Sequence, residues 1–142
     1  DGFLVVDLPY EEAQEAVPSM RRSGLDWIAL AAPTSGMKRI REIDRAGSGF
    51  LYLITLTGVT GVRESLLPGV ASWTREVSRA VRLPVAVGFG ISSPRMAREA
   101  TRHADAAVVG SACVKIVERH GRGRRGAAEL QRFVRSLKSA LR

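Results

Sequence analysis

Glycine and serine residues cluster at three places in this sequence, each directly after an apolar run. Gly58-Val59-Thr60-Gly61 follows Phe50–Thr55, Gly88-Phe89-Gly90-Ile91-Ser92-Ser93-Pro94 follows Val85–Val87, and Gly110-Ser111 follows Ala106–Val109. Glycine lets a backbone approach a ligand closely, and Ser93-Pro94 is a typical helix start. The unpaired N–H groups at such starts favour an anion. We therefore predict a phosphate cradle at the carboxyl ends of parallel strands.

Residues for metal, disulfide or nucleophilic chemistry are sparse. Cys113 is the single cysteine, so no disulfide can form within the chain, which is typical of a reducing cytoplasm. Cys113, His103 and His120 are too scattered to suggest a metal site. Asp7 ends the first apolar run, where a barrel enzyme could use a carboxylate.

The elements that must position these groups alternate regularly between strands and helices. Short apolar runs predict buried parallel strands, and helical spacing predicts the segments between them. The predicted strands are Phe3–Val6, Trp27–Ala31, Phe50–Thr55, Pro84–Val87 and Ala106–Val109. The predicted helices are Glu11–Arg22, a segment around Met37–Asp44 for which Pro33-Thr34-Ser35 offers an N-cap, Val70–Val81, Pro94–His103, Gly110–Val117 and a final amphipathic helix through Leu130–Leu141.

Three connecting features carry expectations of their own. Pro18 lies inside the first helix and should kink or break it. The stretch Leu56–Gly69 is long enough to be a functional lid. Arg119–Gly126 is basic and punctuated by glycine, which predicts a linker.

Five strand–helix units with an extra short helix at the last glycine turn predict an α/β fold, a partial (β/α)8 TIM barrel forming one domain over residues 1–142. A complete barrel takes about 250 residues, so we expect the first strands to precede Asp1. Five strands by themselves would leave two sheet edges and an apolar inner face open.

The net charge of +8 lies almost wholly at the carboxyl end of the chain. Residues 115–142 hold nine Lys/Arg and two Asp/Glu, and residues 1–114 hold thirteen and twelve. A basic stripe can bind phosphate backbones, so a non-catalytic module that binds nucleic acid is one alternative. A solvated last helix is the simpler interpretation, and no apolar run approaches the length of a membrane span. We expect no nucleic-acid or membrane partner, no signal peptide and a cytoplasmic location.

The motifs together resemble one family, the tryptophan synthase alpha subunit, in its C-terminal part. The resemblance extends from Asp1 to about His120 and rests on these segments: Asp1–Pro9 with Glu11-Glu12, Ala32-Pro33-Thr34, Gly49–Tyr52, Thr57–Gly61, Gly88–Pro94 and Gly110–Ile116. It implies a lyase subunit that cleaves indole-3-glycerol phosphate to indole and glyceraldehyde 3-phosphate. It also implies no cofactor on this chain and a partner beta subunit, in an alpha2-beta2 assembly, that holds pyridoxal phosphate.

The resemblance also assigns residues. The phosphate site falls on Gly61, Gly90, Gly110 and Ser111, and the indole pocket falls near Leu4, Val6, Leu30, Tyr52 and Phe89. Thr60 lies in the lid, and Pro9 lies near the beta-subunit contact. The family's arginine of the lid corresponds to Leu56 here, and Asp7 is structural or signalling rather than catalytic.

The family's catalytic glutamate and aspartate belong to the part of the barrel before Asp1, so no residue of this chain is assigned as catalytic. We therefore expect the chain by itself not to be catalytically competent. An isomerase-type phosphate-binding barrel is a second alternative, since such enzymes share glycine-ended strands. As we read them, they lack the Gly58–Gly61 lid beside Gly88–Pro94.

Overall fold

The structure, a computed structural model, describes residues 1–54, 69–88 and 90–141. Six short strands alternate with helices over these residues, and every strand pair is parallel. The strands are β1 (Gly2–Phe3), β2 (Asp26–Trp27), β3 (Ala29–Ala31), β4 (Leu51–Ile54), β5 (Val85–Gly88) and β6 (Ala106–Val108). The helices are α1 (Tyr10–Arg22), the 3-10 turn η1 (Pro33–Ser35), α2 (Gly36–Ala46), α3 (Val70–Ala80), α4 (Pro94–Ala100), α5 (Ser111–His120) and α6 (Arg124–Ala140). The predicted parallel α/β fold is confirmed.

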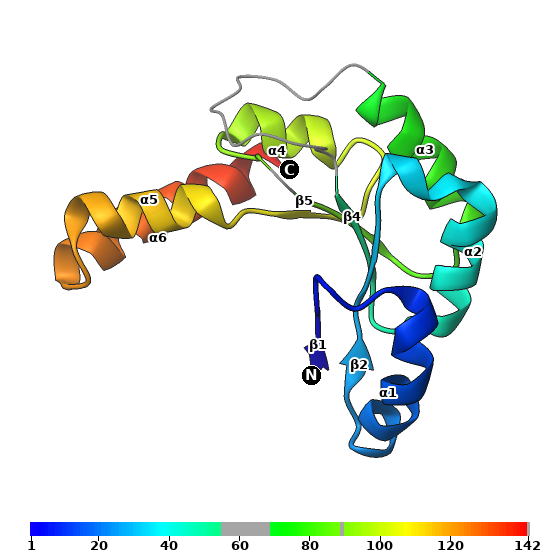
Figure 1. The fold of residues 1–142 in the computed structure, drawn as a ribbon. Helices are drawn as coiled ribbons and strands as arrows, with labels where there is room; N and C mark the ends of the chain where they lie inside the picture. The colour runs from blue at the N-terminus through cyan, green and yellow to red at the C-terminus, as the bar shows by residue number, and fades with distance from the viewer. Residues whose placement is uncertain (55–68, 89, 142) are drawn as a thin grey trace.

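The strands form an open arc (Figure 1). β1 pairs with β2, and β3, β4, β5 and β6 follow in chain order as a second sheet. The predicted strand Trp27–Ala31 is thus divided into β2 and β3 at Ile28. The predicted strand Phe3–Val6 is shorter than expected, because pairing is limited to Gly2 with Asp26 and Phe3 with Trp27.

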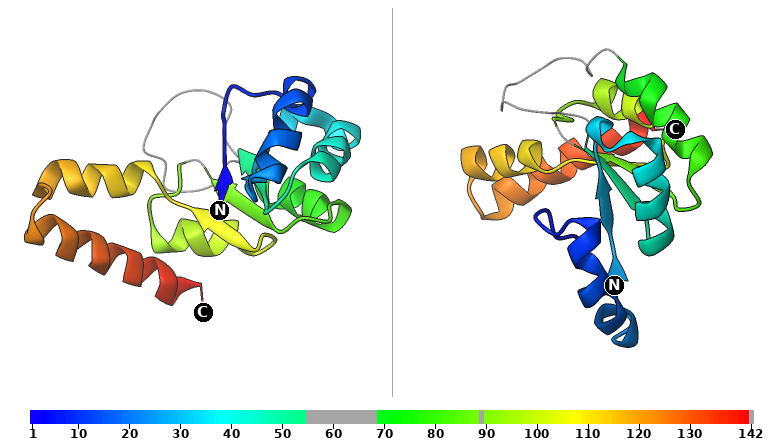
Figure 2. Two further views of the ribbon diagram at one scale, coloured as in Figure 1. Left: turned by 90° about the horizontal axis from the view of Figure 1, so that it is seen from below. Right: turned by 45° about the vertical axis from the view of Figure 1, so that its right-hand side comes forward.

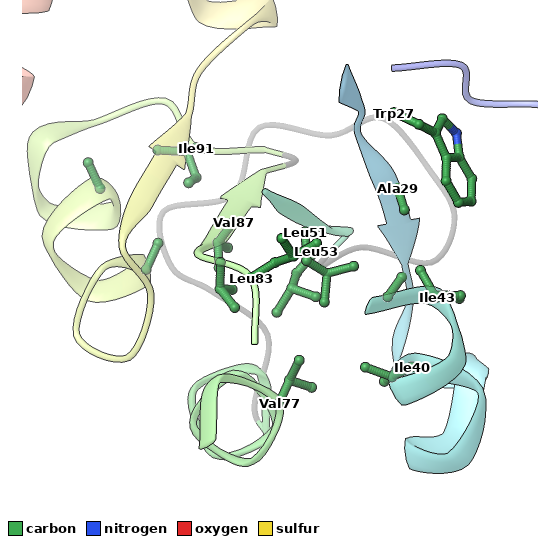
Figure 3. Close-up of a cluster of buried hydrophobic side chains, with 14 of the residues drawn as sticks. Trp27, Ala29, Ile40, Ile43, Leu51, Leu53, Val77, Leu83, Val87 and Ile91 are labelled. Carbon is green, nitrogen blue, oxygen red and sulfur yellow. The ribbon is translucent and has the colours of Figure 1, made fainter. Parts of the chain in front are cut away.

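The core lies between the sheet and the helices that cover one of its faces. Leu51 and Leu53 on β4 are fully buried, whereas Tyr52 and Ile54 between and after them are half-buried, as alternation along a strand requires. Figure 3 shows Ile40 of α2 and Val77 of α3 pointing toward Leu51 and Leu53. The half-buried residues therefore belong to the opposite face, which the helices leave open.

Helix α1 is continuous through Pro18, so the predicted break does not occur. Pro18 and Gln14, whose carbonyl loses its partner at a proline four residues later, are both exposed. Hydration of that carbonyl limits the cost of the proline. The N-cap expected before α2 also differs, because the hydroxyl of Ser35 accepts a hydrogen bond from Ala32 N–H and caps no helical amide.

Helices α5 and α6 form an antiparallel pair that extends away from the sheet (Figures 1 and 2). The predicted linker Arg119–Gly126 is therefore wrong, since only Gly121–Gly123 separates the two helices. Helix α6 is fastened to α4 by Arg98 Nε, which donates to the carbonyl of Ala140 at 2.8 Å. Leu137 is buried, whereas Val134 remains 48% exposed, so only part of the apolar stripe is core. No helix within the described ranges is long and apolar enough to cross a membrane.

Candidate functional site

The glycine turns after β5 and β6 lie at the same end of the sheet, where the carboxyl ends of the parallel strands meet; this end is called the carboxyl edge below. Gly88 of β5 is in register with Val108 of β6, and both strands run in the same direction. Gly90, two residues after the end of β5, therefore lies beside Gly110, which is two residues after the end of β6. Gly90 has φ of 76°, a left-handed conformation that glycine adopts without strain. The structure thus brings two of the predicted phosphate residues to the same edge.

The start of α5 presents backbone donors that no side chain occupies. Gly110 is the N-cap residue and contributes no side-chain hydrogen bond. The N–H groups of Cys113 and Val114 donate to the Gly110 carbonyl, at 2.9 and 3.1 Å. The N–H groups of Ser111 and Ala112 precede the first intrahelical bond, as helix geometry requires. Ser111 is exposed, so an oxyanion can reach its hydroxyl and these two amides.

The start of α4 is different, because its own side chain fills the cap. Ser93 Oγ accepts a hydrogen bond from Met96 N–H at 3.3 Å, which confirms Ser93 as the predicted N-cap. The sequence pattern treats the two helix starts alike, but of the two the structure leaves only the start of α5 without a side-chain cap. Gly110 and Ser111 are therefore the better-placed pair for an anion.

Tyr52 and Leu30 form the centre of the open sheet face. Leu30 of β3 is in direct register with Tyr52 of β4, and both are half-buried. The Tyr52 ring extends over β5, where a Cβ added to Gly88 would overlap the phenolic oxygen. Burial raises the pKa of Tyr52 above its ordinary value, so the phenol is neutral at physiological pH. The face offers a neutral aromatic surface close to the glycine turns.

A cavity of about 150 Å³ opens beside this face. Polar and apolar atoms contribute about equally to its wall, and its larger apolar side chains come from these residues: Val6, Leu8, Trp27, Leu30, Ile43 and Ile54. A cavity of about this volume has room for a small aromatic ring. Pro9 and Arg39 also contribute to the lining. Two of the predicted indole-pocket residues, Val6 and Leu30, are therefore brought together by the structure.

Other predicted site residues are not brought into this arrangement. Gly61, Thr60 and Phe89 lie outside the described residues, as does the expected lid from 56 to 68. Leu4 is 38% exposed and does not line the cavity. Asp7 is also exposed. Within the described part of the chain, no three His, Cys, Asp or Glu side chains are grouped as a metal site would require.

Sequence reasoning placed Val6 and Leu30 in this cavity and missed the other residues of its wall, among them Trp27, Ile43 and Ile54. Ile54 could have been found, because it follows Tyr52 by two residues and so shares its face. Trp27 and Ile43 gave no such signal, since both have the pattern of ordinary core positions.

Comparisons with known proteins connect this geometry to one family. A family model described as tryptophan synthase alpha chain matches residues 1–142. The alpha chain of Geobacter sulfurreducens is 47% identical over 142 residues, which is all of this chain and 52% of that protein. The alpha chain of Solibacter usitatus is 45% identical over 138 residues, which is 97% of this chain and 52% of that protein.

Solved structures give the same result. In the tryptophan synthase a2b2 complex of Pyrococcus furiosus, one chain superimposes with a TM-score of 0.86 at 38% identity, covering 98% of this chain and 56% of that one. The alpha chain of Legionella pneumophila superimposes with a TM-score of 0.83 at 30% identity, covering 99% and 52%. The chain spans about half the length of these relatives, so its open arc is part of a (β/α)8 barrel. The family model and these relatives together show that the chain belongs to the tryptophan synthase alpha chain family.

Proposed function

We propose that this chain is the phosphate-binding half of a lyase subunit of tryptophan biosynthesis, which cleaves indole-3-glycerol phosphate to indole and glyceraldehyde 3-phosphate. The observation that carries the proposal is a juxtaposition. The Tyr52 ring, beside Leu30, reaches Gly88 at the end of β5, and Gly88 is in register with Val108, two residues before the uncapped start of α5 at Gly110. A phosphate ester of a glycerol joined to indole needs those two surfaces close together.

The phosphate end is assigned to Gly90, Gly110 and Ser111, with Gly61 as a fourth member from outside the described residues. One helix terminus stabilises a nearby anion by roughly 0.3–1 kcal/mol, so several converging donors are needed. The amides of Ser111 and Ala112, the Ser111 hydroxyl and the left-handed turn at Gly90 supply such a set. Binding there orients the glycerol carbons toward the sheet face.

The indole end is assigned to the open face and its cavity. Leu30, Tyr52 and Val6 provide the apolar surface, and Leu4 and Phe89 are proposed to extend it. Exclusion of water from an aromatic ring contributes about 25 cal/mol per Å² of apolar area. The apolar part of the substrate therefore adds to the affinity that the phosphate provides.

Cleavage requires a base that removes a proton from the glycerol hydroxyl and an acid that protonates the indole carbon. Neither role is assigned to a residue of this chain. Because its raised pKa keeps the Tyr52 phenol protonated, no phenolate is available as the base, and we assign Tyr52 to orienting the ring. We expect the 142-residue chain by itself to release no indole. Indole release that is abolished by Asp7→Asn would contradict this.

The partner and the location follow from the same proposal. A beta subunit carrying pyridoxal phosphate is the proposed partner, and its contact is placed near Pro9, the exposed N-cap residue of α1. This chain is proposed to hold no cofactor of its own and to act in the cytoplasm. The residues are proposed to form a single domain over 1–142.

Calorimetric titration with a non-cleavable indole-alkyl phosphate tests the phosphate assignment, on chain shown to be folded by circular dichroism. Gly110→Asp should abolish binding, because a carboxylate would occupy the amides and repel the phosphate. Gly123→Asp is the matched control, since Gly123 is the N-cap of α6 and, like Gly110, has open space where a Cβ would be added. Equal loss in both variants, or retained binding in Gly110→Asp, would contradict the assignment.

No observation favours the two alternatives. An isomerase-type barrel would share the glycine turns, but the family match extends over the whole chain. For the nucleic-acid module, the basic helix α6 is bonded to α4 by Arg98 and buries Leu137. Both features are equally expected of an outer helix that binds no nucleic acid. Steep salt dependence of nucleic-acid binding would be the sign of that alternative.

A further inference from the structure

The cavity beside Leu30 has a single charged residue among the described residues of its lining, Arg39 of α2. The others are apolar or uncharged. A guanidinium that is the one charge at this cavity would attract a ring that carries a carboxylate, because arginine binds carboxylates through two parallel hydrogen bonds. The charge state around Arg39 therefore bears on which ligands the cavity accepts.

Glu11 of α1 neutralises this arginine. Arg39 Nη1 lies 2.8 Å from Glu11 Oε1, and Arg39 Nη2 donates to Glu11 Oε2, also at 2.8 Å. Both terminal nitrogens are thus engaged by one carboxylate, in the forked geometry that fixes a guanidinium in orientation as well as in charge. The pair joins the first turn of α1 to α2 next to the cavity.

We infer that Glu11 is a specificity-determining residue, which reserves the cavity for a neutral aromatic ring by neutralising Arg39. The inference rests on the proposed function and adds that the site selects an aromatic ring without a charge. With the pair intact, a ligand carboxylate would have to compete with Glu11 and would be repelled by it. With Glu11 made neutral, the same arginine becomes free to bind that carboxylate.

The size of the effect follows from the exposure of the pair. The side chains of Arg39 and Glu11 are 44% and 57% exposed, so solvent screens their charges. Exposed pairs of this kind change free energies by a modest amount, which corresponds to about threefold to fivefold in a dissociation constant. Selectivity should therefore shift measurably without any loss of the fold.

The probes are indole, which is neutral, and indole-3-acetate, which carries a carboxylate. The chain has two tryptophans, and their indole N–H signals provide the readout in nitrogen-edited NMR. Trp27 lines the cavity, and its Nε1 has no hydrogen-bond partner among the described residues, whereas Trp73 lies on α3 and is not part of the lining. Titration should move the Trp27 signal and leave the Trp73 signal in place.

Four proteins decide the question: the parent chain, Glu11→Gln, Arg39→Gln and the double variant. The parent should prefer indole, and Glu11→Gln should shift the ratio of the two dissociation constants toward indole-3-acetate by about threefold to fivefold. Arg39→Gln and the double variant should show no such shift. Glu129→Gln breaks the exposed Glu129–Arg132 pair on α6 and controls for the change in net charge.

The outcomes distinguish a failure of this inference from a failure of the proposed function. Equal ratios in Glu11→Gln and Arg39→Gln would mean that the pair is only a clamp between α1 and α2, and would overturn the inference while leaving the proposed function intact. A shift in Glu129→Gln as large as that in Glu11→Gln would overturn it as a general charge effect. If indole fails to move the Trp27 signal of the folded parent chain, the indole pocket itself is contradicted.

Discussion

The two ends of the strands deal with free backbone N–H groups in opposite ways. At the amino end of β5, the buried carboxylate of Asp44 accepts from Arg82 N–H at 3.0 Å and from Leu83 N–H at 2.9 Å. Asp105 likewise accepts from Val85 N–H at 2.8 Å. At the carboxyl ends, Gly110 leaves the first amides of α5 without a side-chain cap. The amino end uses protein carboxylates to satisfy these donors, whereas at the carboxyl end Ser93 caps α4 and the start of α5 stays open for a ligand.

This contrast explains where stability and binding are located. A donor paired with a protein carboxylate adds to the free energy of unfolding but cannot bind a phosphate. A donor left to water adds little to stability and remains available. Loss of the carboxylates at the amino end is thus expected to lower stability, and substitution at the uncapped start of α5 to change ligand affinity, which agrees with the division of roles in (β/α)8 barrels.

The largest effect is expected for Asp44→Ala, which removes the acceptor of two backbone amides. Leu83 is buried, so its N–H would be left unpaired away from water. Hydrogen bonds to a charged group contribute about 1.5–3 kcal/mol each, and we expect a loss of about 3–5 kcal/mol in the free energy of unfolding. Urea denaturation followed by circular dichroism measures it. Asp44→Asn should cost less, and a loss below about 1 kcal/mol in the alanine variant would contradict the role given to Asp44.

Gly88→Ala should cause the next largest loss in the free energy of unfolding, because the added methyl group would collide with a packed aromatic ring. The new methyl group would overlap Tyr52 Oη and the ring carbon that bears it, so the ring must move. Overpacking of this kind costs about 1–3 kcal/mol. Combining it with Tyr52→Leu should restore much of that stability. Strict additivity of the two single changes in a double-mutant cycle would show that the two residues are not coupled.

Ser93→Ala should cost about 1 kcal/mol, the typical value for loss of an N-cap side chain. The hydroxyl that accepts from Met96 N–H would be absent, and α4 would lose its cap. Thermal unfolding of the variant gives the value. Ser111→Ala is the informative counterpart, since Ser111 is not used as a cap and its removal should leave stability almost unchanged. Equal destabilisation by both changes would remove the distinction between the two helix starts.

Gly110→Asp should raise stability slightly while it abolishes phosphate binding. The carboxylate would cap α5 as Asp44 caps the amino end of β5, and such a cap contributes about 0.5–1 kcal/mol. Urea midpoints of the variant and the parent chain test this in the absence of ligand. A destabilised variant would mean that the start of α5 is not free to accept a side-chain cap.

The strands and the glycine turns were predictable from the sequence because their signals are local. Apolar runs such as Leu51–Ile54 need no tertiary information to indicate strands, and Ser93-Pro94 starts a helix by its own chemistry. The failures have non-local causes. Gly126 has the pattern of a linker residue, but it lies inside α6, where a Cβ would overlap the carbonyl of Gly121, so the glycine permits close packing of a turn.

The cavity and its ion pair could not be predicted from the sequence for a related reason. Glu11 and Arg39 are 28 residues apart, and nothing in either segment indicates that the first turn of α1 faces α2. The predicted strand Phe3–Val6 is too long for a similar reason, since pairing requires a partner and β2 provides one only for Gly2 and Phe3. Phe3 and Val6 remain 52% and 68% exposed, which their apolar character alone would not predict.

The smallest effect concerns His103, which lies before β6 at the amino edge. Its Nε2 accepts from Arg75, with Nη2 at 3.0 Å and Nε at 3.3 Å, and only a neutral imidazole can accept. Desolvation and the neighbouring Arg75, Arg102 and Arg79 lower the pKa of His103 below its ordinary value of 6.5. The unfolded chain therefore binds this proton at a higher pH than the folded chain does.

The stability that depends on the neutral His103 ring should be complete above pH 6.5 and should decline as the pH falls below it. Urea denaturation of the parent chain and of His103→Gln at a series of pH values on both sides of 6.5 isolates this component. His120→Gln is the control, because it leaves the Arg75 contact intact. Parallel pH profiles for the parent chain and His103→Gln would show that the arginine contact does not depend on the charge of the ring. The contribution of His103 to stability would then be independent of pH.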